Sequence, residues 1–551
     1  MKRMRALAKW AGVGAALALL GAVDGASAQP KEQGVQDQAQ TALSPPVLLR
    51  VPEDPTVSFS VQFRVGSEED PPGKEGLAFL TGQMLAQAAT EANSYEAILE
   101  KLYPLASRYD MRVDREATTL TGRTHRDNLD AYLPLFMDAY LRPAFKAQDF
   151  ERIKNDAINY LENTLRYSSD EELGKAELER FIFEGTPYAH PPEGTVAGLE
   201  SVTLDDVRNF YRSHYTQANA VVGLGGGFDD ALVARLEKSL RELPGGSAQN
   251  GGASSESGAS ARGAASGGAG AAAGAGASGA APSIEPPPID GRKVLLIDKP
   301  GADASISFGF PIDVLRGERD FYALWIANSW LGEHRNQASH LFQVIREIRG
   351  LNYGDYSYIE AFPEGGERSM PPVNVPRHHQ IFSVWIRTLP NEHALFALRA
   401  AMRELERLVD RGMTKEQFEL QRSFLKKYIL HFAESTEERL GYAVDDRFYG
   451  IDGDGHLARF QRMLDELTVD DVNAALKKHL QYRNVKIAIV TGKAEELANA
   501  LASDAPSPIE YSNPKPQEVL DEDKEIASYP LGIERDDIRI EPVASAFAKN
   551  D

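Results

Sequence analysis

The sequence predicts an α+β fold in which one α/β unit occurs twice, and three observations lead to this prediction. In the first half, a strand with alternating apolar and polar residues at 57–65 precedes a helical segment. The sequence Thr-Leu-Asp-Asp-Val at 203–207 recurs as Thr-Val-Asp-Asp-Val at 468–472 in the second half. A long stretch of Gly, Ala, Ser and Pro at 245–288 separates the two halves.

The first unit spans residues 45–244 and opens with the alternating strand. Its apolar positions are Val57, Phe59, Val61, Phe63 and Val65, and the polar residues between them predict a strand with one solvated face. The pattern that follows predicts helices at 74–89, 95–108, 128–141 and 146–167, and a closing strand at 221–225.

The second unit spans residues 292–500 and repeats this plan. Strands are expected at 294–297 and 305–310, a helix at 320–331 and a closing strand at 485–490. Thr203 and Thr468 are each expected to cap a helix whose first turn carries two aspartates. Residues 245–288 should form a disordered linker, and the Pro-rich, charged tail at 501–551 should wrap the surface.

Residues 1–28 have the features of a signal peptide. A basic start precedes a short apolar segment and the small-residue cleavage site Ala-Ser-Ala at 26–28. The chain has no cysteine, which excludes disulfides, thiol catalysis and a lipoprotein anchor. We expect a periplasmic or secreted protein that is not inserted in the membrane after cleavage; an uncleaved membrane anchor is the alternative.

The formal net charge of the 551-residue chain is −21. A chain this acidic repels nucleic acid and anionic membranes, so neither is an expected partner. It could attract cationic peptides, although ordinary solubility explains the charge equally simply.

Residues 76–84, Gly-Leu-Ala-Phe-Leu-Thr-Gly-Gln-Met, resemble the zinc helix of the insulinase/pitrilysin (M16) metallopeptidases, Gly-Leu-Ala-His-x-x-Glu-His-Met. Two further segments are similar to motifs of the same family, Gly-x-Pro-Tyr-x-His-Pro at 185–191 and Leu-x-x-x-x-Arg-x-x-x-Gly-Leu-x-Tyr at 341–353. The resemblance covers nearly all of the mature chain. It implies two homologous LuxS/M16-type α/β-roll domains, each an antiparallel sheet packed with helices, that together form a clam-shell.

Within this helix the motif's other residues are retained, but the zinc-binding and catalytic residues are replaced. Phe79 and Gln83 stand where the family has its two zinc-binding histidines, and Gly82 stands where it has the catalytic glutamate. The family's third ligand, a glutamate, falls near Leu161 or Glu162, and the register favours Leu161. We therefore expect no metal on this chain and a zinc ion on a partner subunit.

The chain's histidines offer no replacement ligand set. His378 and His379 are adjacent and are expected in a surface loop, and the spacing of His334 and His340 does not place them on one helical face. His190 lies in a segment that matches a structural motif of the family.

Arg346 and Tyr353 are the best candidates for substrate-binding residues. In the resembling peptidases this pair in the second domain binds the substrate backbone and stabilises the oxyanion, a role that suits a guanidinium and a phenol. The alternative is an ion pair of Arg346 with Glu347 or Asp355, and a core tyrosine. We expect Gly350 to end the helix that carries Arg346, with Tyr353 on the strand that follows.

The resemblance implies a peptidase-like protein that is silent alone and pairs with a zinc-bearing M16 subunit, as a heterodimer that binds peptides. Two alternatives stay open. One is an active zinc metalloendopeptidase with a non-standard site, and the other is a peptide-binding or scaffold protein without hydrolysis. The sequence leaves open whether the chain is an enzyme.

Overall fold

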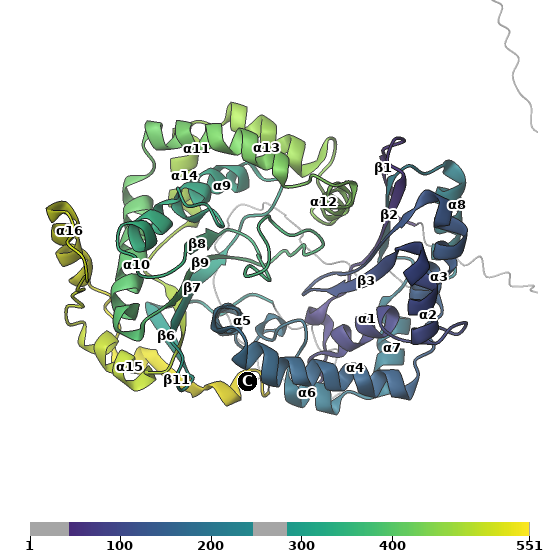
Figure 1. Cartoon of the computed structure of the whole chain (residues 1–551), viewed down its shortest axis with the longest axis horizontal. Helices are drawn as coiled ribbons and strands as arrows, with labels where there is room; N and C mark the ends of the chain where they lie inside the picture. The colour runs from purple at the N-terminus through teal and green to yellow at the C-terminus, as the bar shows by residue number, and fades with distance from the viewer. Residues whose placement is uncertain (1–42, 246–283, 550–551) are drawn as a thin grey trace, which may run out of the picture. The chain divides into compact units, whose positions relative to one another are not determined.

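The computed structural model describes residues 43–245 and 284–549, which carry two β-sheets and the helices that cover them (Figure 1). The predicted signal peptide and most of the predicted linker lie outside the described residues. Within the two described ranges, no helix is long and apolar enough to span a membrane.

The first sheet has five strands in the order β1-β5-β2-β4-β3. Its central strand pairs antiparallel with β4 and β5, whereas β1 runs parallel to β5. The strands are β1 (Val47–Arg50), β2 (Thr56–Phe63), β3 (Arg108–Val113), β4 (Thr118–His125) and β5 (Ala220–Gly226).

The second sheet has six strands in the order β11-β6-β10-β7-β9-β8. Apart from β11 this order repeats that of the first sheet, and β6 runs parallel to β10 as β1 does to β5. The sheets are therefore mixed, not purely antiparallel as expected. The strands are β6 (Arg292–Asp298), β7 (Ala304–Ile312), β8 (Asp355–Tyr358), β9 (Gln380–Leu389), β10 (Val485–Thr491) and β11 (Ile538–Pro542).

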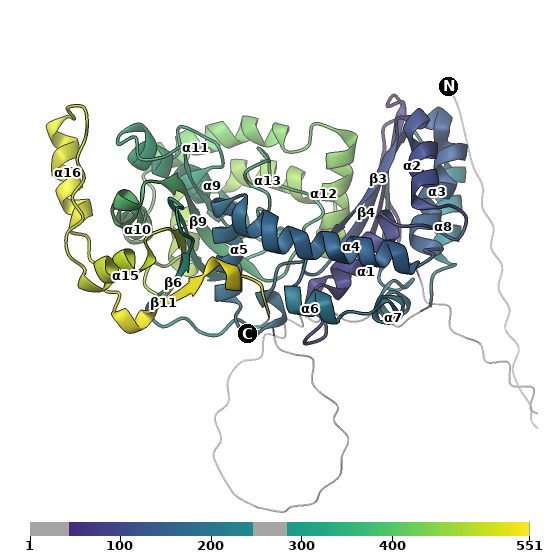
Figure 2. The same ribbon diagram turned by 60° about the horizontal axis from the view of Figure 1, so that its bottom comes forward.

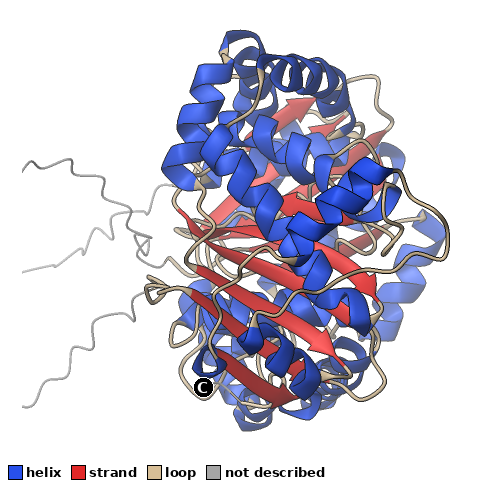
Figure 3. Ribbon diagram, turned by 90° about the vertical axis from the view of Figure 1, so that its left-hand side faces the viewer, coloured by secondary structure: helices blue, strands red, loops and turns tan. Residues whose placement is uncertain are grey.

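Helices line both sheets, as the blue ribbons beside the red strands of Figure 3 show. Those of the first half are α1 (Leu77–Ala86), α2 (Tyr95–Leu102), α3 (Leu129–Leu141), α4 (Ala147–Asn159), α5 (Asp170–Ile182), α6 (Val196–Ser201), α7 (Leu204–His214) and α8 (Asp230–Leu240). Those of the second half are α9 (Arg319–Gly332), α10 (Ala394–Arg411), α11 (Lys415–Tyr428), α12 (Thr436–Phe448), α13 (Gly455–Glu466), α14 (Val469–His479), α15 (Ala494–Ser503) and α16 (Gln517–Ala527).

The two predicted helix caps are confirmed as capping boxes. The Thr203 hydroxyl accepts from the Asp206 amide, and the Asp206 carboxylate accepts from the Thr203 amide. Thr468 and Asp471 make the same pair of bonds at the start of α14. Each box satisfies backbone donors that a helix start leaves free, and the identical chemistry supports the predicted duplication.

Each half lends one helix to the sheet of the other half. Helix α5 of the first half packs against β7 and β10, and α12 of the second half packs against β1, β2 and β5. Leu440 and Val444 of α12 contact Val47 and Val221, and a Cβ at Gly223 would stand only 2.8 Å from Val444 Cγ2. Glycines on β5 therefore let α12 approach the sheet closely.

This exchange corrects the expected exposure of β2. Ser58, Ser60 and Gln62, which the alternation placed on a solvated face, are buried, because α12 covers that face. Gln62 Nε2 lies 3.4 Å from Asp445 Oδ1 of α12. The alternating pattern identified the strand correctly, but the polar side faces a neighbouring helix instead of water.

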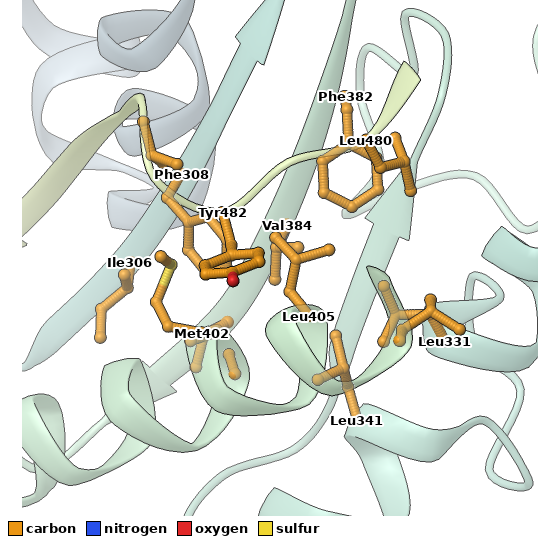
Figure 4. Packing of buried hydrophobic residues seen from close by; sticks show 14 of the residues in the cluster. Ile306, Phe308, Leu331, Leu341, Phe382, Val384, Met402, Leu405, Leu480 and Tyr482 are labelled. Carbon is orange, nitrogen blue, oxygen red and sulfur yellow. The ribbon is translucent and has the colours of Figure 1, made fainter. Parts of the chain in front are cut away.

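The apolar core of the second half lies between its sheet and α9, α10 and α14. In Figure 4, Ile306 and Phe308 of β7 and Met402 and Leu405 of α10 point toward one another. A second cluster of buried residues fills the first half and continues into the second half, where it includes residues of β6 and β10. Each half thus has a cluster of buried apolar residues, and the cluster of the first half extends to the sheet on which α5 packs.

Five strands, β1 among them, and part of the tail were not predicted. The segment expected to be helical at 95–108 ends as α2 at Leu102, and β3 and β4 follow. In the second half, β8 and β9 were likewise missed. The tail does more than wrap the surface, because β11 joins the second sheet beside β6, as Figure 2 shows.

Candidate functional site

Helix α1 carries the three positions at which the zinc chemistry was lost, and its start is firmly anchored. The amides of Gly76 and Ala78 both donate to the Asp70 carboxyl group at 2.7 Å. Burial raises the pKa of Asp70 well above its usual range, although the two hydrogen bonds oppose this. The buried Asp70 carboxyl group thus caps the first amides of α1 and fixes the start of the helix.

Gly82 brings α1 into direct contact with the edge strand β3. A Cβ at this position would overlap Val113 Cγ2, and it would lie 3.4 Å from Met111 Cγ. A glutamate side chain has no room here unless side chains of β3 move. A glycine inside a helix costs about 1 kcal/mol relative to alanine, so the close approach explains why glycine is suited to this position.

Gln83 ties α1 to the same strand through its amide group. Its Nε2 donates to the Met111 carbonyl at 3.3 Å, and its Oε1 accepts from Gln87 Nε2 at 2.8 Å. The Met111 amide in turn donates to Asp110 Oδ1 at 2.9 Å. Both backbone groups of Met111 are therefore occupied by side chains, which blocks the pairing of another strand at this point of the sheet edge.

Phe79 and the segment expected to hold the third ligand also have packing roles. The Phe79 ring is half-buried against the core of the first half. Leu161 is fully buried, and Glu162 is half-exposed with a carboxylate 3.9 Å from Arg166. Across residues 43–245 and 284–549, no group of three or more His, Asp or Glu side chains is placed to hold a metal ion.

The loop at 185–191 supports the start of α1. Arg115 Nη1 donates to the carbonyls of Tyr188 and His190, the latter at 2.6 Å. His190 is buried, its Nε2 lies 3.9 Å from Asp70 Oδ2, and burial lowers its pKa to about 4. A neutral, buried histidine beside the helix cap has a structural role, as the sequence indicated.

Arg346 lies in η6 (Phe342–Glu347), a π-helical segment. Its guanidinium pairs with Glu347 and lies 5.1 Å from the centre of the Phe342 ring, and its side chain is 34% exposed. The ion pair with Glu347 is the one the structural alternative anticipated. Because both partners are partly exposed, this pair holds Arg346 only weakly.

Tyr353 is 77% exposed and lies in the turn before β8, not on the strand where it was expected, and not in the core. Asn352 braces that turn: its Nδ2 donates to Asp355 Oδ1 at 2.8 Å and to the Arg387 carbonyl at 3.1 Å. An exposed aromatic ring on a braced turn is available to a molecule outside the chain. Among the described residues, no hydrogen bond joins Arg346 to Tyr353.

A buried polar network between the two halves was not predicted. Arg377 Nε donates to Asp114 Oδ1 at 2.7 Å, and Arg377 and Arg115 both contact the Glu179 carboxylate. Burial opposes ionisation of Glu179, but the two guanidinium groups outweigh it and hold its pKa at about 2. The residues of this network lie far apart in the sequence, so the spacing of residues within a motif could not predict it.

His378 lies in the loop before β9, as expected, and its side chain, 35% exposed, joins the same network. Its Nδ1 lies 2.5 Å from Glu116 Oε2, and its amide donates to Glu116 Oε1 at 2.6 Å. The Tyr188 hydroxyl also donates to Glu116. Burial, with Glu116 close by, raises the pKa of Glu68 to about 9, so the cluster holds one neutral and one ionised carboxyl group.

Two family descriptions match consecutive parts of the chain. Residues 47–195 match "Insulinase (Peptidase family M16)", and residues 201–425 match "Peptidase M16 inactive domain". The chain belongs to the M16 peptidase family. The zinc ion that this family implies does not fit here, because Phe79 and Gly82 offer no ligand atom and the Gln83 amide is bonded to β3 and to Gln87.

Relatives with and without a peptidase name resemble the chain. "Non-peptidase homolog YmxG" of Helicobacter pylori is 22% identical over 439 residues, 79% of this chain and 88% of the relative. "Uncharacterized zinc protease YmxG" of Bacillus subtilis is 22% identical over 321 residues, 58% of this chain and 69% of the relative.

Solved structures share the fold. The peptidase M16 inactive domain from Pseudomonas fluorescens has a TM-score of 0.65 at 21% identity, and the match covers 80% of this chain and 94% of that one. A protease from Helicobacter pylori has a TM-score of 0.63 at 18% identity, with 82% and 98% covered. The predicted two-domain M16 fold is thereby confirmed.

Proposed function

We propose that this chain is the non-catalytic subunit of a two-subunit M16 peptidase, and that it acts in the periplasm or outside the cell. It pairs with a zinc-bearing M16 subunit and contributes Arg346 and Tyr353 to the binding of the peptide substrate. The partner supplies the zinc ion and the catalytic glutamate.

The observation that carries this proposal is the reuse of the zinc helix for packing. Gly82 and Gln83 fasten α1 to β3, and Asp70 caps the helix, so each is explained without catalysis. The helix keeps its position although its zinc-binding and catalytic residues are replaced. This is expected of a subunit that contributes its fold, and not a catalytic centre, to the complex. The alternative of an active metallopeptidase lacks ligands at these positions.

Arg346 and Tyr353 in the second half support the proposed binding of the peptide substrate. A guanidinium and a phenol are hydrogen-bond donors suited to a peptide carbonyl that gains negative charge. Arg346 is held by a partly exposed ion pair and by the Phe342 ring, and Tyr353 stands on a braced turn, so both side chains remain accessible to a bound peptide. Neither residue is needed for the core of this chain.

One feature of the edge strand β3 argues against the alternative of a peptide-binding scaffold without hydrolysis. Capture of an extended peptide by a sheet needs free backbone groups along an edge strand. On β3 the amide and carbonyl of Met111 are already bonded to side chains. A peptide bound by this protein is therefore held by side-chain donors such as Arg346 more than by the edge of the first sheet.

The test is turnover by the assembled complex of this chain with a zinc-bearing M16 protein from the same genome. Arg346→Ala should lower kcat by about 10²-fold while complex formation is unchanged. Arg152→Ala is the matched control, because Arg152 also pairs with a carboxylate, that of Asp149, also lies over a ring, that of Tyr95, and has a side chain that is 39% exposed. Full turnover by an assembled Arg346→Ala complex would exclude the proposed role.

Tyr353→Phe tests the second donor and has its own control. Loss of the hydroxyl should lower kcat with no change in assembly, because the ring and the turn stay in place. Tyr103→Phe removes the hydroxyl of another exposed tyrosine, 88% accessible, and should leave kcat unchanged. If both variants behave like the parent chain, the hydroxyl of Tyr353 has no part in the reaction.

A further inference from the structure

Helix α11 presents an apolar surface to solvent. Leu420 is 71% exposed and forms one wall of a groove of about 400 Å³. The groove is lined by residues of α11 and of the short segment η8 (Ile429–His431) that follows it; these are Leu420, Ser423, Phe424, Lys427, Tyr428 and His431.

The lining residues form two rows with a spacing of four. Leu420, Phe424 and Tyr428 make an apolar row, and the second row, also with spacing four, consists of Ser423, Lys427 and His431. Residues four apart form a ridge along a helix, and the groove between two such ridges accepts a ridge of another helix at a crossing angle of about −50°. The shape of the groove therefore suits a helix.

The apolar row is held rigid from below. The rings of Phe424 and Tyr428 stack with centroids 4.7 Å apart, and Tyr428 meets Phe432 edge-on at 5.6 Å. Phe432 is buried in the core of the second half, where it contacts Trp325. Binding to a surface that is already ordered loses little conformational entropy.

The repeated architecture shows that this surface is not required by the fold. Helix α4 holds the equivalent place in the first half, before the helix that is lent to the other sheet. Its exposed residues beyond the first turn are all polar; they are Glu151, Asn155, Asp156 and Asn159. Because α4 lacks such a row, the apolar row of α11 is not part of the architecture that the two halves share, and it has a role specific to the second half.

Charge indicates what kind of helix fits. Lys427 and His431 are the titratable lining groups that can be cationic, and no carboxylate lines the groove. No residue in the described ranges forms an ion pair with Lys427, whereas His431 pairs with Glu434 at 2.5 Å. In a chain of net charge −21, the Lys427 ammonium group beside an apolar row is complementary to an acidic partner.

We propose that α11 is a docking surface for an amphipathic helix of another protein, with apolar residues along one face and acidic residues beside them. The apolar face of that helix covers Leu420 and Phe424, and its carboxylates meet Lys427. This site is independent of the zinc-bearing partner and of Arg346, so it goes beyond the function proposed above.

The experiment uses the full chain and a labelled synthetic helix of roughly 20 residues, long enough to be helical alone. The probe contains Leu, Ala and Glu, with Leu on one face and Glu beside it, and a second probe carries Lys in place of Glu. Fluorescence anisotropy should show binding of the Glu probe about tenfold tighter than that of the Lys probe. Equal binding of both probes, or binding of neither, would overturn the proposal.

Three variants locate the site. Leu420→Asp should weaken binding of the Glu probe at least about tenfold, and Lys427→Glu should reverse the preference between the probes. Leu430→Asp is the control: Leu430 is 60% exposed on the same segment but does not line the groove, so its replacement should change nothing. A Leu420→Asp chain that binds as well as the parent would refute the assignment.

Two other occupants would each replace the proposed one. If the chain forms a concentration-dependent dimer in sedimentation and Leu420→Asp abolishes it, the surface binds a second copy. If the chain binds vesicles of anionic phospholipid and Leu420→Asp releases it, the surface binds a membrane. Either result without binding of the Glu probe overturns the acidic helix as partner.

Discussion

The same helix-to-edge-strand contact occurs in both halves, but its interior differs. In the first half α1 packs on β3, and Gly82 and Gln83 leave no space between them. In the second half α9 packs on β8 around a cavity of about 20 Å³. Trp325 Nε1, Asn328 Oδ1 and Glu333 Oε2 belong to residues lining that cavity, and none has a hydrogen-bond partner among the described residues.

The difference shows that the two halves can share an arrangement of helices and strands and still carry different side chains at the same contact. Capping boxes, the lent helix and, apart from β11, the strand order are the same in both halves. The first contact is closed by a glycine and a glutamine, whereas the second keeps a buried carboxyl group. Function assigned to one half therefore cannot be transferred to the other by fold alone.

The largest expected effect comes from reopening the first contact. Gly82→Glu forces a side chain into β3 and buries an unpaired carboxylate, which should cost on the order of 5 kcal/mol in the free energy of unfolding. Gly82→Ala should cost about 1–3 kcal/mol, because only its Cβ overlaps Val113. Urea denaturation measures both.

Gly174→Ala is the matched control for this overlap. Gly174 also lies in a helix, α5, but a Cβ there would find its nearest atom, Val490 Cγ2, at 3.7 Å. The replacement should be neutral or stabilise the chain by up to about 1 kcal/mol. If Gly82→Ala is as well tolerated as Gly174→Ala, α1 and β3 are not in the close contact described.

The buried carboxyl group of the second contact should make stability depend on pH. Burial raises the pKa of Glu333 from its usual value of 4.5 to about 7. Between these values the folded chain keeps a proton that the unfolded chain releases, so stability falls as the pH rises through this window.

Glu333→Gln removes this dependence. The free energy of unfolding of the variant relative to the parent should rise by about 3 kcal/mol between about pH 4 and about pH 8. Glu151→Gln, at an exposed position of α4, should show no such change. A constant difference between parent and Glu333→Gln at all pH values would mean that burial does not raise the pKa of Glu333 in the folded chain.

A smaller effect is expected for the amide that closes the first contact. Gln83→Ala leaves the Met111 carbonyl without its partner and should lower the free energy of unfolding by about 1–2 kcal/mol. It should also speed hydrogen exchange along β3, which amide exchange measures residue by residue. Unchanged exchange at β3 would show that Gln83 does not hold the strand.

The smallest effect tests the equivalence of the halves. Thr203→Ala and Thr468→Ala each remove the hydroxyl of a capping box with the same two bonds. Each should cost about 1 kcal/mol, and the two costs should agree closely. Costs that differ several-fold would show that the two helix starts are not energetically equivalent.

The sequence predicted what local chemistry determines. The alternation from Val57 to Val65 identified β2, and Thr203 and Thr468 identified two helix starts. The lost zinc ligands at Phe79 and Gln83 were also visible, because a motif depends on residue type and spacing. Each of these signals extends over at most about ten residues.

What the sequence could not predict depends on partners distant in the chain. The segment Arg108–Val113 does alternate, with Tyr109, Met111 and Val113 buried, but it directly follows a helical pattern that was extended too far. The exchange of α5 and α12 left no local pattern. His378 contacts Glu116 across 262 residues, and adjacent histidines in a polar segment gave no sign of it.

We infer that α1 holds no zinc, because the positions of the family's ligands serve packing in this chain. The direct measurement is a calorimetric titration of Zn²⁺ into the purified, metal-free chain, followed by determination of its bound metal. We expect no stoichiometric binding of zinc and no chelator-sensitive peptidase activity in the chain alone. Tight binding of one zinc ion per chain, with peptide cleavage that a chelator abolishes, would contradict it.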